Sequence, residues 1–495
     1  MQALFELFIL LLAAYVVVHA IGQVAISALT YGIIANGLPF RRTEVAEFLL
    51  TGLEPPISLL VPAYNEALTI VGSVRSILQL RYADYEIIVV NDGSRDATLG
   101  TLTAAFELEP FPLAYHARLE ARAVRGAYRS AAHPNLIVID KENGGKADAI
   151  NAGINASRYP LFCCIDADSI LDRDSLLRVV QPFIEDSRTV ACGGTVRLVN
   201  GGEVSKGRLL RTGLPSSWLA RFQSVEYLRG FLFGRMGWSR PNGLLIISGA
   251  FGLMHKDTVI ECGGYRHQTI GEDMELIVRM HRLLQRRGRP YRITYVPEPV
   301  CWTEAPEDWA TLRNQRVRWQ RGLCESLWLN RSLLFAWPPS AAGWLAYPYF
   351  VLFEWAAPIV EALGYVLLAW MLLVHGIRTD IALLFLLVAM CFGVLLSTLA
   401  LMLDELAFHV YPRRRDLLVL FAVGILENFG YRQINVWWRL QGTWQWLRGK
   451  QGGWGAMQRK GFAEAPVAPL NVPVTVQNSS EIGSRSRSPQ TNLPN

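Results

Sequence analysis

The chain has 495 residues, a formal net charge of +6 at pH 7 and a hydrophobic content of 51%. This length allows two or three domains, and the hydrophobic content is high for a soluble enzyme. The modest positive charge is concentrated near apolar segments, which indicates lipid headgroups and anionic substrates and argues against nucleic acid as a partner. The seven cysteines show no metal-ligand spacing, so they are predicted to be reduced core residues.

The first predicted element is an apolar segment over residues 4–35, which contains a single charged residue, Glu6. About 20 apolar residues are enough to cross a bilayer, so the sequence predicts one transmembrane helix within residues 1–40. A secretory signal peptide is disfavoured because no basic region precedes the apolar run. Arg41 and Arg42 follow it, which places the next domain on the cytoplasmic side of the inner (plasma) membrane.

Residues 55–300 are predicted to form a globular domain in which strands and helices alternate. Buried strands are expected within residues 57–66, 85–98 and 159–171, and a helix over residues 67–80. This alternation is typical of a mostly parallel sheet with covering helices, in which ligands bind at the carboxyl ends of the strands.

Three of the predicted strands end in acidic or amide residues: Asn65 with Glu66, Asn91 with Asp92, and Asp166 with Asp168. Because parallel strands end at one edge of a sheet, these groups are expected to lie close together.

Asp166 and Asp168 lie two residues apart, directly after the apolar strand. In an extended chain, residues at this spacing point the same way. Two facing carboxylates repel each other unless a cation lies between them, and Mg²⁺ or Mn²⁺ suits oxygen ligands. The alternative is that Asp168 or Ser169 caps the following helix. The position at the ligand-binding edge favours the metal site.

Other candidate residues each have a plain structural alternative. Asp92 lies in a common turn sequence. Lys146 follows a glycine pair at a helix start, which suits phosphate, but it would also suit an exposed helix lysine. Asp273 begins an amphipathic helix, where a carboxylate also complements the helix dipole. Residues 248–257 are small enough for a ligand to approach the backbone, or they form a glycine-rich bend.

Three apolar runs follow the globular domain, at residues 344–374, 381–408 and 416–438. The first two are predicted to cross the membrane, and for the third a full crossing and an interfacial position both remain open. A basic interfacial segment is expected over residues 441–463, and a disordered tail over residues 464–495, which contain too little apolar surface to fold.

Polar residues within these runs are Glu354, Glu361, Glu427 and Asn428. They are predicted to face protein groups or a lumen, because such groups are costly in lipid.

Four short motifs occur in order: Asn-Asp-Gly, Asp-Ala-Asp, Gly-Glu-Asp, and Gln-Arg-Val-Arg-Trp. Across residues 55–440 they resemble the D, DxD, ED and QxxRW signature of membrane-embedded processive family 2 glycosyltransferases. This group contains the cellulose, chitin, hyaluronan and poly-N-acetylglucosamine synthases. Gly271 stands where cellulose synthases commonly have threonine. The resemblance implies an α/β GT-A type nucleotide-sugar domain joined to transmembrane helices over residues 341–440, with interfacial helices over residues 301–340.

The resemblance also implies a role for each matching residue. The nucleotide sugar would be bound by Ala63, Tyr64, Glu66, Asp92, Lys146, Asp166, Gln315, Arg318 and Trp319. The acceptor would be bordered by Ser248, Gly249 and Trp319, and Mg²⁺ or Mn²⁺ would be held by Asp168 and Asp166. Asp273 would be the general base, positioned by Glu272.

The function implied by the resemblance is an inverting, metal-dependent hexosyl transfer that builds a β-linked polysaccharide from a UDP-sugar. UDP-N-acetylglucosamine is the first candidate donor. Expected partners are the UDP-sugar, a growing polysaccharide or lipid acceptor, membrane lipids and export proteins. Two alternatives remain: a non-processive transferase that adds one sugar to a lipid carrier, and an inert scaffold or receptor subunit of an envelope complex.

The helix that carries the last motif is predicted to have two different faces. Gln315, Arg318 and Trp319 are spaced to share one face, which would turn toward the diphosphate and the acceptor. Arg316 would point elsewhere and, with Arg313 and Arg321, contact lipid. This predicts that Arg316→Ala is tolerated and that Arg318→Ala is not.

Overall fold

The computed structural model describes residues 2–48, 52, 54–374, 379–411 and 413–449, and every structural statement below refers to these residues. The segment over residues 450–495, which includes most of the predicted basic segment and the predicted disordered tail, lies outside the described residues.

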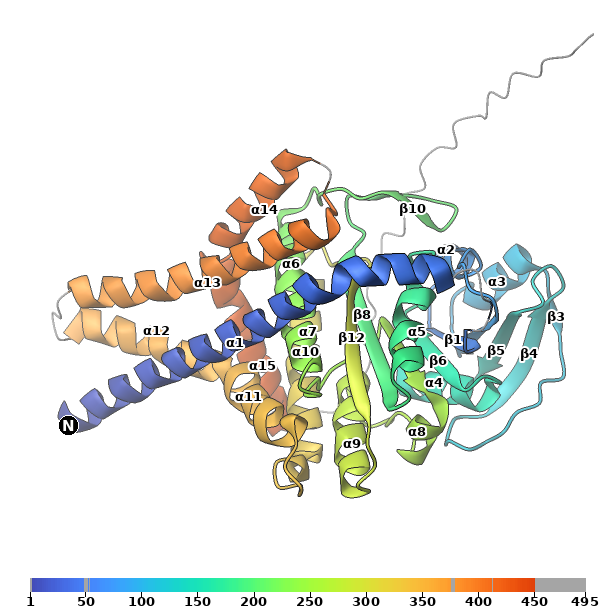
Figure 1. Ribbon diagram of the computed structural model, residues 1–495, viewed down its shortest axis with the longest axis horizontal. Helices are drawn as coiled ribbons and strands as arrows, with labels where there is room; N and C mark the ends of the chain where they lie inside the picture. The colour runs from blue at the N-terminus through green and yellow to red at the C-terminus, as the bar shows by residue number, and fades with distance from the viewer. Residues whose placement is uncertain (1, 49–51, 53, 375–378, 412, 450–495) are drawn as a thin grey trace, which may run out of the picture. The chain divides into compact units, whose positions relative to one another are not determined.

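A ten-stranded sheet forms the centre of the globular part (Figure 1). Its strand order is β3-β4-β5-β2-β1-β6-β11-β8-β12-β7. The strands are β1 (Ile57–Ala63), β2 (Tyr85–Asp92), β3 (Leu108–Pro110), β4 (Val124–Ser130), β5 (Leu136–Lys141), β6 (Leu161–Ile165), β7 (Ile170–Leu171), β8 (Thr189–Leu198), β11 (Phe251–His255) and β12 (Arg292–Thr303). A separate hairpin is formed by β9 (Glu203–Ser205) and β10 (Arg208–Arg211).

The predicted GT-A type α/β fold is confirmed, and its sheet is mixed. The strands β5, β2, β1 and β6 run parallel to one another, as expected. Strand β11 lies between β6 and β8 and is antiparallel to both. Its residues are buried on both faces, so its sequence looks like that of a parallel strand and does not reveal its direction.

Helices cover the sheet, and the helices that the sequence predicted over residues 67–80, after Asp273 and at Lys146 are present. These are α2 (Ile70–Ile77), α9 (Glu272–Arg286) and α4 (Lys146–Ala156). Other helices of this part are α3 (Thr98–Phe106), α5 (Ser175–Glu185), α6 (Trp218–Tyr227), α7 (Met236–Ser239) and α8 (Lys256–Glu261). The helix α4 packs on β1 and β2 through small residues, and a Cβ on Gly153 would lie 3.2 Å from the Leu60 side chain.

The remaining helices include α1 (Gln2–Phe48), α10 (Trp309–Leu329), α12 (Ala357–Val374), α13 (Thr379–Phe408), α14 (Arg414–Leu426) and α15 (Tyr431–Leu447). Of these, α1, α12, α13 and α14 are largely apolar, whereas α10 and α15 mix apolar and polar residues. In the described part of the chain, Leu10–Ala35 and Met390–Phe408 are long and apolar enough to cross a membrane. Two bent pairs, Ala342–Trp355 with Ala357–Trp370 and Arg414–Leu426 with Tyr431–Leu447, raise this number to four if each is one span. These helices identify a membrane protein.

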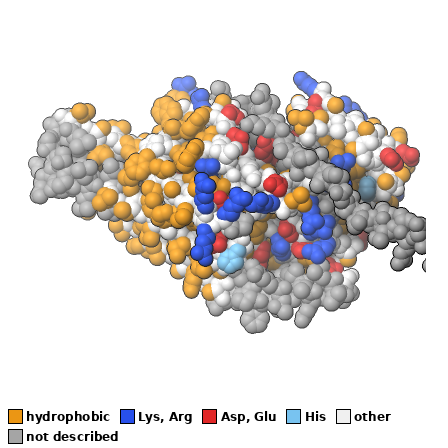
Figure 2. All heavy atoms as spheres, turned by 90° about the horizontal axis from the view of Figure 1, so that it is seen from above, with side chains coloured by type: hydrophobic (Ala, Val, Ile, Leu, Met, Phe, Trp, Pro, Cys, Tyr) orange, Lys and Arg blue, Asp and Glu red, His pale blue; other side chains and the backbone are white. Residues whose placement is uncertain are grey.

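Side chains on the surface have the distribution expected at a membrane boundary. Figure 2 shows hydrophobic side chains gathered over one side of the view, with Lys and Arg side chains beside them. Arg414 and Arg415 are exposed at the start of α14, which otherwise presents apolar residues such as Leu418. Exposed apolar helices bordered by basic residues suit a bilayer and its headgroups.

Charged residues inside the apolar runs bond to protein groups, as predicted. Glu361 accepts hydrogen bonds from Arg432 at 2.8 Å, and Glu427 forms an ion pair with Arg229 in η1 (Leu228–Arg235). A buried ion pair between Arg197 of β8 and Asp404 of α13 joins the sheet to a candidate span.

Candidate active site

The carboxyl ends of β2, β1 and β6 lie side by side, as the sequence predicted, because these three strands are neighbours and parallel. The loops that follow β1 and β2 are bonded to each other. The Asn65 backbone N–H donates to Ser94 Oγ at 3.0 Å, and Asn65 Oδ1 accepts from the Arg95 N–H at 2.8 Å. Asn65 has a φ of 57°, a conformation that asparagine tolerates better than most residues. The loop that contains Tyr64 and Glu66 is therefore held in one shape.

Asp92 is buried, and its carboxylate is bonded within the chain. Lys141 Nζ donates to Asp92 Oδ1 at 2.6 Å, and the Gly144 and Gly145 N–H groups donate to its two carboxylate oxygens at 3.0 and 2.7 Å. Lys141 also forms an ion pair with Asp148 of α4. Asp92 therefore anchors the glycine-rich segment that leads into α4. Its contact with the nucleotide stays a prediction.

Lys141 was not singled out from the sequence. Its side chain is fully buried between the carboxylates of Asp92 and Asp148. The sequence feature that marks Lys141 is its position at the end of the apolar strand β5. A lysine at such a position is usually exposed, so this feature does not predict its burial.

Lys146 opens α4 and connects the second and third motifs. Its ammonium group lies 2.5 Å from Asp166 Oδ1 and 3.6 Å from Glu272 Oε1, and it donates to the Gly249 carbonyl at 3.4 Å. Burial alone lowers the pKa of Lys146, but the carboxylates of Asp166 and Glu272 outweigh burial and raise the pKa above its usual value. The alternative of an exposed helix lysine is wrong.

Asp166 and Asp168 do not lie on an extended strand, which corrects the geometry expected from the sequence. The strand β6 ends at Ile165, and the Ser169 N–H closes a turn by donating to the Asp166 carbonyl at 3.0 Å. The turn forms because the chain reverses before the short strand β7. The capping alternative is also wrong, because α5 begins at Ser175 and has Asp174 as its N-cap.

The Asp-Ala-Asp turn still provides oxygen donors of the kind that Mg²⁺ and Mn²⁺ bind. The Asp168 side chain is buried and that of Asp166 is partly exposed. Within the described residues, no group of three or more His, Cys, Asp or Glu side chains could hold a metal ion by itself. A divalent ion at this turn would therefore take further ligands from substrate oxygens or water, as is usual for Mg²⁺.

Asp273 lies in the first turn of α9 and is partly exposed. Its Oδ2 accepts a hydrogen bond from the Gly249 N–H at 2.9 Å. A Cβ on Gly249 would lie 2.9 Å from Lys146 Nζ and 3.4 Å from Asp273 Oδ2, so a larger residue there would displace the Lys146 ammonium group. Residues 248–250 form a turn before β11, and this turn brings its backbone to the carboxylate.

Glu272 is buried beside Asp273. Burial raises the pKa of Glu272 to about 7, although the Lys146 ammonium group acts in the opposite direction. The positive charge of Arg318 in α10 also acts on the Glu272 carboxyl, so the fourth motif lies near the third. The helices α9 and α10 pack against each other.

The last motif lies on α10, where Gln315 is buried, Arg318 is half-buried and Trp319 is 43% exposed. The prediction that Arg316 contacts lipid is wrong. Arg316 is buried, forms an ion pair with Glu226 of α6, and places its guanidinium group 4.5 Å from the centre of the Trp319 ring. Residues 316 and 319 are three apart on a helix and are therefore also neighbours.

Arg313 and Arg321 of this helix were also predicted to contact lipid, and they differ from each other in burial. Arg321 is buried, against the prediction, whereas Arg313 is exposed as expected.

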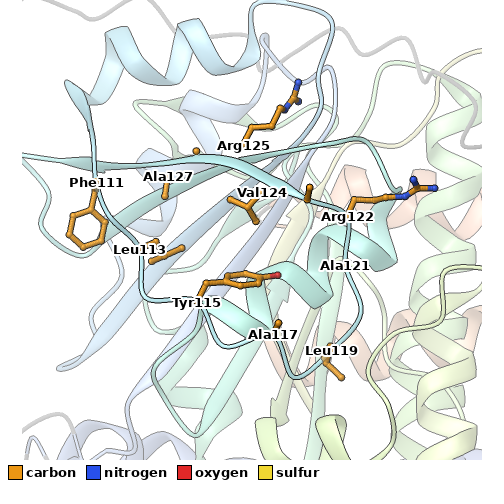
Figure 3. Close-up of a pocket in the computed structure, with 12 residues that line it drawn as sticks. Phe111, Leu113, Tyr115, Ala117, Leu119, Ala121, Arg122, Val124, Arg125 and Ala127 are labelled. Atoms are coloured by element: carbon orange, nitrogen blue, oxygen red, sulfur yellow. The ribbon is translucent and has the colours of Figure 1, made fainter.

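A cavity of about 390 Å³ lies away from these motifs, between β4 and the extended segment that precedes it (Figure 3). Alternate side chains of the segment, including Phe111, Leu113 and Tyr115, point toward it. Its lining residues include none of those predicted for the active site.

Comparisons with known proteins show related families and relatives. Residues 58–259 match the family described as glycosyl transferase family 2, and residues 161–401 match glycosyl transferase family group 2. The chain is 30% identical over 267 residues to the poly-beta-1,6-N-acetyl-D-glucosamine synthase of Staphylococcus aureus strain COL, which is 54% of each protein. It is 28% identical over 322 residues to the synthase of the same name from Staphylococcus epidermidis, covering 65% of this chain and 66% of the relative. The matched region thus spans about half the length of the first of these relatives.

Among solved structures, the mannosyltransferase PcManGT from Pyrobaculum calidifontis, in complex with GDP-Man and Mn²⁺, covers 86% of this chain and 99% of its own at 18% identity and a TM-score of 0.46. The mixed sheet and the acidic cluster at its edge define a GT-A type glycosyltransferase. The chain belongs to the family 2 glycosyltransferases.

Proposed function

We propose that this enzyme polymerises a β-linked polysaccharide from a UDP-sugar at the cytoplasmic face of the inner membrane, with UDP-N-acetylglucosamine as the first candidate donor. The observation that carries the proposal is the placement of Asp273. Its carboxylate is partly exposed, is held by the Gly249 N–H at 2.9 Å, and lies next to the cluster of Lys146, Asp166 and Glu272. The names of the staphylococcal relatives support the choice of donor and product.

The proposed reaction is a direct displacement at the anomeric carbon. A hydroxyl group of the acceptor attacks this carbon, its proton passes to Asp273, and the bond to the diphosphate breaks with its electron pair leaving on UDP. Attack from the side opposite to the leaving group inverts the anomeric centre. An α-linked donor therefore gives a β-linked product, and finding α-linkages in the product would contradict this step.

The leaving diphosphate needs positive charge beside it. Asp166 and Asp168 would hold Mg²⁺ or Mn²⁺, which stabilises charge on phosphate oxygens when bound. Arg318, whose charge already acts on the buried Glu272, supplies a second positive group from α10. Lys146 keeps its proton because Asp166 and Glu272 raise its pKa, so it remains a cation at the centre of the site.

Aromatic side chains on α10 and α6 offer a surface for sugar rings. Trp319 is 43% exposed, and its ring centre lies 6.4 Å from that of Tyr227. We place the growing acceptor chain on this surface, from which it would continue between the membrane helices. The exposed arginines at the start of α14 support a cytoplasmic position for the sheet domain.

The test is to incubate the purified full-length protein in nanodiscs with a panel of UDP-sugars and Mg²⁺ or Mn²⁺. Release of UDP with a high-mass product supports the polymerase. Release of UDP with only a lipid-linked monosaccharide supports the non-processive alternative, and no turnover with any donor supports the scaffold. Removal of the metal with EDTA is expected to abolish turnover, and its return is expected to restore it.

A further inference from the structure

The backbone immediately before the Glu-Asp motif is held by one face of α10. Glu325 Oε2 accepts a hydrogen bond from the Ile270 N–H at 2.9 Å, and Ser326 Oγ donates to the Gly271 carbonyl at 3.3 Å. Gly322 lies three and four residues before them, so all three residues share one side of the helix. Gly271 is the N-cap of α9, and Glu272 and Asp273 are the next two residues.

Gly271 and Gly322 let the two segments touch through their backbones. A Cβ on Gly271 would lie 2.9 Å from the Gly322 Cα, and a Cβ on Gly322 would lie 2.9 Å from the Gly271 Cα and N. A side chain at either position would push the segments apart. This contact explains why residue 271 is glycine in this chain.

The opposite side of α10 is fixed to the helix α15. Gln320 donates from Nε2 to Thr443 Oγ1 at 3.1 Å, and Gln320 Oε1 accepts from Arg439 Nε at 2.8 Å. A Cβ on Gly442 would lie 2.8 Å from the Gln320 Cβ. The helix α10 is therefore held between α15 and the N-cap of α9 and cannot shift toward either without breaking these contacts.

We propose that Gly322, Glu325 and Ser326 are positioning residues for the general base Asp273. They hold the N-cap of α9, and through it they set the approach of the Asp273 carboxylate to the Gly249 N–H and to the acceptor. The inference rests on the proposed function, because it assigns a role toward the base of that reaction. A displacement of about 1 Å at a reacting group can reduce turnover on the order of 100-fold.

The test uses the full-length protein in nanodiscs and the UDP-sugar that gives turnover. Glu325→Ala removes the acceptor of the Ile270 N–H and is expected to lower kcat by about tenfold or more, with KM for the donor within about twofold. Glu325→Gln keeps an acceptor oxygen and is expected to restore most of kcat. Gly322→Ala is expected to lower kcat further. Gly100→Ala in α3 is the matched control, because a Cβ there meets nothing within 4 Å.

Hydrogen exchange at the Ile270 amide provides a readout that does not depend on turnover. Glu325→Ala should speed its exchange, and Glu325→Gln should not. Unchanged exchange in Glu325→Ala, or an equal loss of kcat in the alanine and glutamine variants, would overturn the proposal. Faster exchange with an unchanged kcat would also overturn it. If the wild-type protein turns over no donor, the proposed function fails, and the positioning role toward a base fails with it. If the wild type turns over but the variants do not behave as stated, only the positioning role fails.

Discussion

Asp92 and Asp273 belong to motifs of the same signature, but their surroundings differ. The Asp92 side chain is 4% exposed, and its carboxylate is bonded to Lys141, to Asn143 and to two glycine N–H groups. The Asp273 carboxylate is partly exposed, and its hydrogen bonds come from the N–H groups of Gly249 and Met274. A carboxylate enclosed by a cation and backbone donors holds a loop in place. A partly exposed carboxylate that is bonded to backbone N–H groups can still accept a proton from a substrate.

The largest expected effect comes from Asp273→Asn. The amide keeps an oxygen that can accept from the Gly249 N–H, but it cannot take up a proton from the acceptor. Transfer should fall on the order of 1000-fold, while UDP binding stays close to that of the wild type. Rates of UDP release and titration with UDP measure the two properties. A loss of UDP binding would show that Asp273 belongs to the nucleotide site instead.

The main effect of Asp92→Ala should be a loss of stability, and its effect on any single step of catalysis should be smaller. It leaves the fully buried Lys141 with one carboxylate fewer, and breaking a buried pair costs about 3 kcal/mol of unfolding free energy. Asp257→Ala is the control, because its ion pair with Arg118 is exposed and surface pairs contribute about 0–1 kcal/mol. Thermal unfolding in nanodiscs compares the two variants. Equal shifts would mean that Asp92 is not a structural anchor.

Arg316→Ala is expected to destabilise the protein by about 2 kcal/mol, because it leaves Glu226 without the guanidinium group and removes the contact with the Trp319 ring. Arg313→Ala, on the same helix but exposed, should have no measurable effect. Unfolding temperatures of both variants provide the measurement. If the two variants are equally stable, the ion pair between α10 and α6 contributes nothing.

A further expected effect is a dependence of stability on pH through Glu272, whose pKa burial raises to about 7. A raised pKa in the folded state means that the fold favours the protonated carboxyl. The resulting stability is fully present below the unfolded pKa of Glu, about 4.3, and is lost as the pH rises through about 7. The unfolding temperature of the wild type relative to Glu272→Gln should therefore fall between about pH 5 and pH 8. A constant difference would indicate that Glu272 stays ionised beside Lys146.

Periodicity and motif order were sufficient to predict the strands β1, β2 and β6, the helix α9 and the edge where the motifs meet. These features depend on local patterns, because buried strands and amphipathic helices have recognisable spacings. Strand direction was not predictable, since β11 is apolar on both faces whichever way it runs. The turn at Asp166 and Asp168 was missed because two residues are too few to show where a strand ends.

The misassigned residues depend on partners that are distant in the chain. Arg316 is buried because Glu226, 90 residues earlier, lies beside it. Lys141 is buried because Asp92 comes from the neighbouring strand. From a short stretch of sequence, a buried and paired cation cannot be distinguished from one that faces lipid, because both occur in an amphipathic helix or at the end of a strand.

The ion pair between Arg197 and Asp404 has a consequence for how the protein is made. In the described part of the chain, every strand lies between residues 57 and 303, whereas Asp404 lies near the end of α13. The ribosome therefore synthesises all the strands, including Arg197, about 100 residues before Asp404 emerges. An aspartate in lipid is costly without a partner, so the candidate span in α13 depends on Arg197 of the sheet to pair its carboxylate.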